Sequence, residues 1–340
     1  MGGWRRSGQV LLFFAGVLAI CGSILAYRVH DRYMTEPMAA RDIVVFIPKG
    51  SSLADIAQRL HETGLLSGTW DQQIFTFVTR FVRQRSALQA GEYAVSGGSS
   101  MDDVADQMVS GAGIVSYALT IPEGLTVAEV LEQVRSMSVL TGDITVTPRE
   151  GTLLPETWHV VRGDTRDAVI QRMMTAMDSV LDDLWSRRPE DFPLKSRDDV
   201  LTLASIVEKE TSVPEERGLV AGVFLNRLRL KMLLQSDPTV IYGLSPDDGD
   251  LGRPLSRADL KTNHPWNTYT RSGLPAGPIG NPGRLSLEAV LFASPTNKLY
   301  FVADGTGGHV FAKTLAEHNR NVFRWRRISR NKKNAPSNRP

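Results

Sequence analysis

Two glutamates separated by one lysine are the residues of this chain best suited to acid–base chemistry. Glu208 and Glu210 follow the apolar run 203–207. A carboxyl group set among apolar residues has a raised pKa and can donate a proton near neutral pH. Glu208 has Ala204, Ser205 and other small residues three and four positions away, and small neighbours leave room for a substrate. We therefore predict that Glu208 is the catalytic group, although helical periodicity alone does not choose between the two carboxylates.

Three later segments could complete a site around this helix. The first is the polar stretch 234–243, and the second is 266–269, which contains two aromatic residues. The third, 273–283, holds three prolines that stiffen it and several glycines that allow close backbone approach. We expect it to form a rigid cleft wall. Asp237 precedes Pro238, so it is explained equally well as the start of a helix.

Together these segments resemble the MltG/YceG-like endolytic murein transglycosylases. The resemblance is dense from Gly151 to Val322 and weaker from Arg41 to Val134. It implies a membrane-anchored lyase that cuts peptidoglycan glycan strands without a cofactor, and it places the catalytic glutamate at Glu208. It also implies that five polar residues bind the substrate, namely Gln235, Asp237, Thr239, Asn267 and Tyr269.

A lytic transglycosylase needs only one carboxyl group, because the attacking hydroxyl belongs to the substrate. Glu208 is expected to protonate the oxygen between N-acetylmuramic acid and N-acetylglucosamine, then to accept the proton of the muramic C6 hydroxyl as a 1,6-anhydro ring closes. One alternative is a hydrolytic muramidase, whose second carboxylate would be Glu210, Glu215, Glu216 or Asp237. The other is a scaffold that binds glycan without cutting it. Product analysis separates the three.

The composition argues against several other classes of function. The chain has 39 basic and 37 acidic residues, so it lacks the overall positive charge of a nucleic-acid-binding protein. Its six histidines are scattered without the spacing of metal ligands, and we expect no metal site. The single cysteine, Cys21, excludes an intramolecular disulfide.

The apolar run 10–27 is 18 residues long and has no charged residue, so it predicts a helix that spans the cytoplasmic membrane. Cleavage as a signal peptide and lipidation at Cys21 are the weaker interpretations, because bulky Ile24 and Ile20 stand where small residues are needed. Basic residues flank both ends. The short N-terminal tail and the resemblance favour an N-terminus inside, with the remaining chain in the periplasm at the inner membrane.

The region 41–134 contains three diverged copies of a strand, a Gly/Ser turn and a helix. A Ser or Thr is placed to cap each helix, and apolar residues recur at helical spacing after it. The pattern resembles a LysM-like region, which implies docking to glycan. A plain spacer domain is the alternative, since the turns carry no aromatic cluster.

The predicted fold is α+β, with an N-terminal transmembrane helix, a LysM-like β-α repeat subdomain and a mixed α+β catalytic domain. Only the short link 31–40 separates the membrane helix from the domains that follow. We therefore expect the enzyme to trim nascent glycan strands beside the peptidoglycan synthases. The expected order is a cytoplasmic tail at 1–9, the membrane helix at 10–27, a linker at 28–40, the LysM-like domain at 41–147, the catalytic domain at 148–326 and a basic disordered tail at 327–340.

Overall fold

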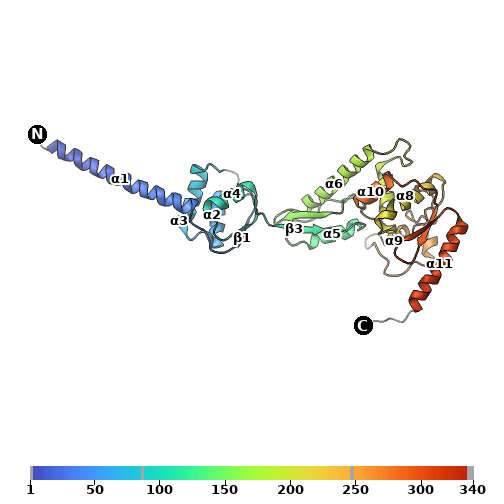
Figure 1. The fold of residues 1–340 in the computed structure, drawn as a ribbon. Helices are drawn as coiled ribbons and strands as arrows, with labels where there is room; N and C mark the ends of the chain where they lie inside the picture. The colour runs from blue at the N-terminus through green and yellow to red at the C-terminus, as the bar shows by residue number, and fades with distance from the viewer. Residues whose placement is uncertain (1–2, 86–87, 246–248, 335–340) are drawn as a thin grey trace. The chain divides into compact units, whose positions relative to one another are not determined.

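The computed structural model describes residues 3–85, 88–245 and 249–334, and its α+β fold confirms the predicted class (Figure 1). The chain divides into two compact units. The first unit comprises Met1–Tyr117 and His159–Asp164, and the second comprises Ala118–Trp158 and Thr165–Pro340. The division does not follow the predicted boundary at residue 147, because residues 118–147 belong with the second unit.

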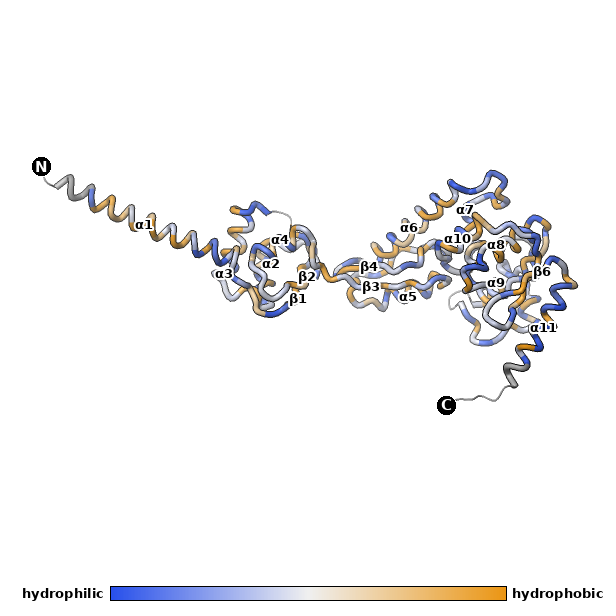
Figure 2. The backbone as a smooth tube through the Cα atoms, viewed as in Figure 1, coloured by the Kyte–Doolittle hydropathy of each residue, from blue (hydrophilic) through white to orange (hydrophobic). Residues whose placement is uncertain are grey.

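The first helix, α1 (Gly3–Met34), contains one stretch that is long and apolar enough to cross a membrane (Figure 2). This stretch, Gln9–Met34, is longer than the predicted run. The predicted linker at 28–40 is wrong in its first half, since α1 continues to Met34. Tyr33 and Met38 are buried in the core of the first unit. The segment after the apolar run is therefore part of a folded unit.

The first unit packs helices on a two-stranded antiparallel sheet, in which Ile43 lies opposite Val95. Side chains that alternate along β1 face this core, among them Val45 and Ile47, as expected for a strand with one covered face. The elements in chain order are β1 (Ile43–Ile47), α2 (Leu53–Glu62), α3 (Thr69–Phe77), the π-helical turn η1 (Val78–Val82), β2 (Gly91–Val95) and α4 (Met101–Ser110).

The predicted helix caps of the three strand-turn-helix copies are confirmed. Ser52, Ser100 and Thr126 each accept a hydrogen bond from the third residue of their helix, and an acidic side chain three positions on returns a bond to the cap. The third helix, α5 (Val127–Ser136), belongs to the second unit, so the copies do not form one repeat domain. Whether the region acts as a LysM module stays a prediction.

In the second unit helices form most of the core. Strand β3 (Ser116–Thr120) pairs with β4 (Thr157–Val161) in a separate two-stranded sheet. The others are α6 (Arg166–Ser186), α7 (Arg197–Glu210), α8 (Pro214–Arg229), α9 (Asp237–Leu244), the 3-10 turn η2 (Asp259–Lys261), α10 (Arg284–Leu291), β5 (Tyr300–Ala303), β6 (His309–Ala312) and α11 (Leu315–Asn334).

The C-terminal helix corrects the predicted disordered tail. Helix α11 continues to Asn334, so residues 327–334 are helical despite their basic composition. The rest of that tail, 335–340, lies outside the described residues, as do residues 1 and 2 of the predicted cytoplasmic tail.

Candidate functional site

Helix α7 presents both glutamates of the Glu-Lys-Glu triplet in its last turn. A capping box between Ser196 and Asp199 starts the helix, and its residues 203–207 are buried in the core. The helix ends at Glu210 because Thr211 is extended and Pro214 begins the next helix. Side chains two residues apart on a helix point in different directions, so Glu208 and Glu210 have different neighbours.

The Glu208 carboxylate is enclosed, and both of its oxygens are hydrogen-bonded. The Arg217 Nη2 donates to Glu208 Oε1 at 3.0 Å, and the backbone N–H of Gly283 donates to Glu208 Oε2 at 2.9 Å. Only 5% of the Glu208 side chain is exposed. The space expected beside its small helical neighbours is therefore bordered by the guanidinium of Arg217 from α8.

A second carboxylate shares the same guanidinium. The Arg217 Nη2 also donates to Glu123 Oε2 at 3.1 Å, so Glu123, Arg217 and Glu208 form one network. Burial raises the pKa of Glu123, and the nearby negative charge of Glu208 raises that pKa further. The Glu123 side chain is 40% exposed, whereas the Glu208 and Arg217 side chains are nearly enclosed. The network ties the loop after β3 to α7 and α8.

The Glu210 carboxyl group has a different set of neighbours. The Ser236 hydroxyl donates a hydrogen bond of 2.5 Å to Glu210 Oε1. Burial raises the pKa of Glu210 to about 7, and the charge of Asp237 adds to the rise, while the Ser236 bond and the charges of His309 and Arg227 oppose it. The C-terminal end of a helix also disfavours a negative charge. Glu210 therefore holds a proton in a large fraction of molecules at neutral pH.

The start of α9 brings predicted substrate-binding residues to Glu210. Ser236 occupies the position before α9, but its hydroxyl bonds Glu210 and does not cap the helix. On either side of it, Gln235 and Asp237 are exposed, and Gln235 has a left-handed backbone with φ +51°. The hydroxyl of Tyr269 donates to Asp237 Oδ1 at 2.5 Å. Burial raises the pKa of Tyr269, and its bond to the Asp237 carboxylate raises it further.

Two other predicted substrate-binding residues are buried and support this loop. The Thr239 hydroxyl donates to the Ser236 carbonyl at 2.6 Å and lies 2.9 Å from the Thr268 hydroxyl. The side-chain amide of Asn267 donates to the Thr262 carbonyl at 2.7 Å and accepts from the Tyr269 N–H at 2.8 Å. The polar groups of both side chains therefore form hydrogen bonds within the protein.

The Gly/Pro stretch 273–283 lies against α7 and the loop after β3, as a rigid wall requires. The Ile279 N–H donates to the Ser205 hydroxyl at 3.0 Å, and Asn281 exchanges backbone bonds with residues 124 and 125. Gly280 approaches the Gly124 carbonyl so closely that an added Cβ would lie 2.6 Å from its oxygen. The Trp266 indole donates to the Gly277 carbonyl at 3.1 Å, so it packs against this stretch.

The structure thus separates the predicted site into two groups. Asp237 and Tyr269 lie near Glu210, and Gln235 is the chain neighbour of the Ser236 that bonds it. Glu208 instead joins Arg217 and Glu123. Ser236, Arg217 and Glu123 are not among the site residues predicted from the sequence. Ser236 stands between two residues that are. Arg217 and Glu123 carry no local signal, because their contact joins positions 94 residues apart.

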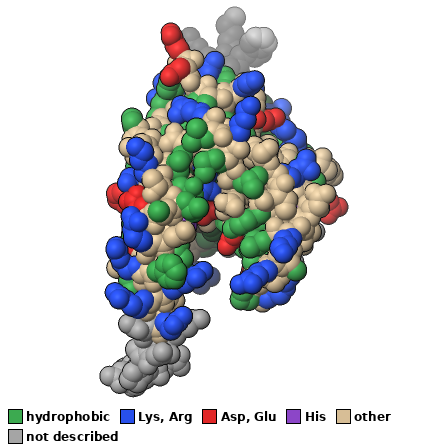
Figure 3. Space-filling model, turned by 90° about the vertical axis from the view of Figure 1, so that its right-hand side faces the viewer, with side chains coloured by type: hydrophobic (Ala, Val, Ile, Leu, Met, Phe, Trp, Pro, Cys, Tyr) green, Lys and Arg blue, Asp and Glu red, His purple; other side chains and the backbone are tan. Residues whose placement is uncertain are grey.

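One face of the protein is hollowed between flanks rich in Lys and Arg, and acidic side chains are visible inside the hollow (Figure 3). Within residues 3–85, 88–245 and 249–334, no cluster of three or more His, Cys, Asp and Glu side chains could hold a metal ion.

Comparison with known proteins places the chain in a family. The model of the YceG-like family matches residues 45–324. An endolytic murein transglycosylase of Bacillus subtilis is 30% identical, with 86% of this chain and 88% of that protein covered. One from Streptococcus pneumoniae is 29% identical over 82% of this chain, which spans only 58% of that protein.

A solved structure agrees with these relatives. The crystal structure of a YceG-like protein of Listeria monocytogenes has a TM-score of 0.51 and 32% identity, covering 83% of this chain and 99% of that one. The matches extend over both units of the fold. This chain therefore belongs to the YceG-like family of murein transglycosylases.

Proposed function

We propose that this chain is an endolytic peptidoglycan transglycosylase that uses Glu210 as its acid and base. It would cleave the β-1,4 bond between N-acetylmuramic acid and N-acetylglucosamine and leave 1,6-anhydro ends. The observation that carries the proposal is the Glu210 carboxyl group, whose pKa is raised to about 7 where the residues predicted to bind sugar meet. The names of the two relatives support the substrate class.

Protonated Glu210 would give its proton to the bridging oxygen as the bond to the muramic C1 breaks. The resulting carboxylate would then take the proton of the C6 hydroxyl, whose oxygen attacks C1 and closes the anhydro ring. The proton lost in the first step is regained in the second, and no water is consumed. A group with a pKa near the working pH serves both steps.

Glu208, the residue favoured by the sequence, is the second candidate for this role. Its position in the same turn supports it, but both of its oxygens already accept hydrogen bonds, from the Arg217 guanidinium and from the Gly283 N–H. We therefore assign Glu208 to the network that holds α7, α8 and the loop after β3 together.

The predicted substrate-binding residues take two roles in this proposal. Gln235, Asp237 and Tyr269 would contact the sugar, since the first two are exposed and Tyr269 is half-buried beside them. Thr239 and Asn267 would act indirectly, by fixing the backbone that presents those three.

We also propose that α1 spans the cytoplasmic membrane with the second unit on the periplasmic side. Its apolar stretch supports the membrane span. Because α1 continues into the folded first unit, the tether is short and favours cutting of nascent strands beside their synthases. Glycan docking by the first unit, as in a LysM module, remains part of the proposal.

Mass spectrometry of purified glycan strands after incubation with the protein tests this function. We expect products with 1,6-anhydro-muramic ends. Reducing muramic ends would identify a hydrolytic muramidase, and intact strands would identify a glycan-binding scaffold. Strands of defined length would also separate internal cleavage from release of terminal disaccharides.

A further inference from the structure

An apolar groove of about 650 Å³ lies between α1 and the helical segment formed by α3 and η1. Its walls include Gly22, Ala26 and Val29 on one side and Trp70, Phe77 and Val82 on the other. Large side chains beside it are exposed to an extent that is unusual in water, since Phe77 is 57% and Phe81 63% exposed.

Polar contacts hold the end of α1 firmly on this segment. The Arg32 guanidinium donates to both carboxylate oxygens of Asp71 in α3, at 3.0 and 2.6 Å. The Tyr33 hydroxyl lies 2.9 Å from the Thr79 hydroxyl of η1, and both side chains are buried. The direction of α1 is therefore fixed relative to α3 and η1.

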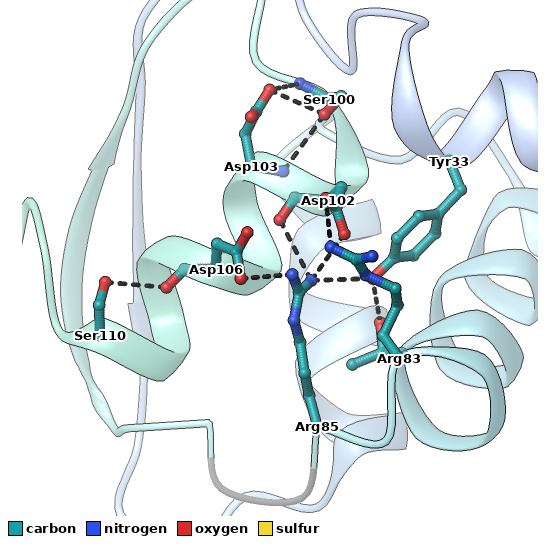
Figure 4. Close-up of polar contacts among 9 residues, drawn as sticks. Tyr33, Arg83, Arg85, Ser100, Asp102, Asp103, Asp106 and Ser110 are labelled. Carbon is teal, nitrogen blue, oxygen red and sulfur yellow. Dashed lines mark hydrogen bonds and ion pairs between the residues drawn. The ribbon is translucent and has the colours of Figure 1, made fainter.

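A second set of contacts reinforces the same joint (Figure 4). The Arg85 guanidinium donates to the Tyr33 hydroxyl at 3.4 Å and to Asp102 Oδ1 at 2.8 Å, and it also pairs with Asp106. Arg83 donates to the other Asp102 oxygen at 3.0 Å. The chain that follows η1 is thus bonded to α4 as well as to α1.

The depth of the groove along α1 determines what surrounds it. Gly22 and Ala26 belong to the uncharged run 10–27, and crossing a hydrocarbon layer takes about 20 helical residues. The groove is lined by residues of α1 from Gly22 to His30. At about 1.5 Å per residue, it therefore follows α1 for roughly 12 Å. If α1 spans the membrane as proposed above, the exposed face of α3 and η1 must lie at the level of the lipids.

The chemistry of this face matches that level. Trp70 is exposed, and tryptophan favours the boundary between lipid and water. The exposed Arg80 has its guanidinium carbon 5.5 Å from the Phe81 ring centre, so a cation stands beside the apolar surface. A cation at that position can meet a lipid phosphate while the aromatic rings enter the acyl region.

We propose that the groove and the exposed face of α3 and η1 are a second membrane contact, occupied by lipids of the leaflet on the side of the first unit. Acyl chains fill the groove, and Arg80 faces the headgroups. This inference rests on the proposed membrane anchor. It makes the first unit a body seated on the bilayer and not one that swings on a flexible stalk.

The test places one fluorescent NBD label at a time in the full chain, reconstituted in vesicles of phosphatidylcholine and phosphatidylglycerol. The native Cys21 is the only cysteine, so labelling it reports on α1 without any substitution. In a Cys21→Ser background, Phe81→Cys reports on the proposed contact. Val44→Cys is the matched control, because Val44 is also an exposed apolar residue but lies on β1.

We expect the labels at 21 and 81 to show blue-shifted emission and quenching by nitroxide lipids, with the shallow nitroxide more effective at 81. The label at 44 should emit as in water. Emission at 81 that matches 44 overturns the second contact and leaves the anchor intact. Absence of quenching at 21 overturns the anchor and the inference together. A label at 81 that is shielded only at high protein-to-lipid ratios identifies a second copy as the occupant and contradicts lipid.

Discussion

The Ser236 hydroxyl donates a 2.5 Å hydrogen bond to the carboxyl group of Glu210. This bond joins the end of α7 to the start of α9, and it places Glu210 beside Asp237 and the exposed Gln235. Glu208, only two residues earlier, bonds to Arg217 instead. The two carboxyl groups of one triplet therefore serve different ends, and the following predictions separate them.

The first prediction concerns the pH dependence of cleavage. Burial raises the pKa of Glu210 to about 7, and the general acid must be protonated. The kcat/KM should therefore be highest in acid and fall about tenfold per pH unit well above that pKa. Initial rates of formation of anhydro ends measure this. A rate that stays level into the alkaline range would show that Glu210 is not the acid.

The second prediction concerns stability. A carboxyl group whose pKa is raised from 4.5 to about 7 by folding resists ionisation in the folded state. The protonated form carries no such penalty in either state. The free energy of unfolding therefore falls as the pH rises from about 4.5 to about 7, and it stays low above that range. The penalty at high pH is on the order of 3 kcal/mol, because each unit of pKa shift corresponds to about 1.4 kcal/mol.

Glu210→Gln removes that penalty because an amide does not ionise. Thermal unfolding should show a higher Tm than that of the native chain at alkaline pH and little difference well below the ordinary pKa of a glutamate. Glu215→Gln, at an exposed position of α8, is the matched control. Its Tm should follow that of the native chain at both pH values. Equal Tm values for Glu210→Gln and the native chain at high pH would contradict the burial of Glu210.

The third prediction concerns the network around Arg217. Arg217→Met leaves the Glu208 and Glu123 carboxylates without their shared guanidinium, so it should destabilise the fold by about 3–5 kcal/mol. Adding Glu208→Gln removes one of the two repelling charges and should restore part of the Tm. Arg217→Met as stable as the native chain, or no rescue in the double variant, would remove the structural role that we give to this network.

Local sequence signals predicted much of the fold. Ser52, Ser100 and Thr126 cap their helices, as a Ser or Thr ahead of apolar residues at helical spacing predicts. The hairpin of β5 and β6 joins two short apolar segments through a Gly-rich turn. Such signals involve neighbours in the chain.

Contacts between distant residues were not predictable in this way. The linker prediction failed because Tyr33 is buried by partners such as Thr79, which lies 46 positions away. The prediction of Glu208 rests on small residues of its own helix, whereas its bonding partner Arg217 belongs to the next helix. In the same way, Ser236 lies 26 residues after Glu210, and no pattern of neighbouring residues connects the two.

The most direct test of the central claim compares the lytic activity of Glu210→Gln and Glu208→Gln on purified glycan strands, with Tm values confirming that both variants fold. We expect Glu210→Gln to lose at least about 100-fold in the rate of formation of 1,6-anhydro ends. Folded Glu208→Gln should keep most of that rate, because its carboxylate is bonded to Arg217 and Gly283. An active Glu210→Gln alongside a folded but inactive Glu208→Gln would contradict the account and return the catalytic role to Glu208.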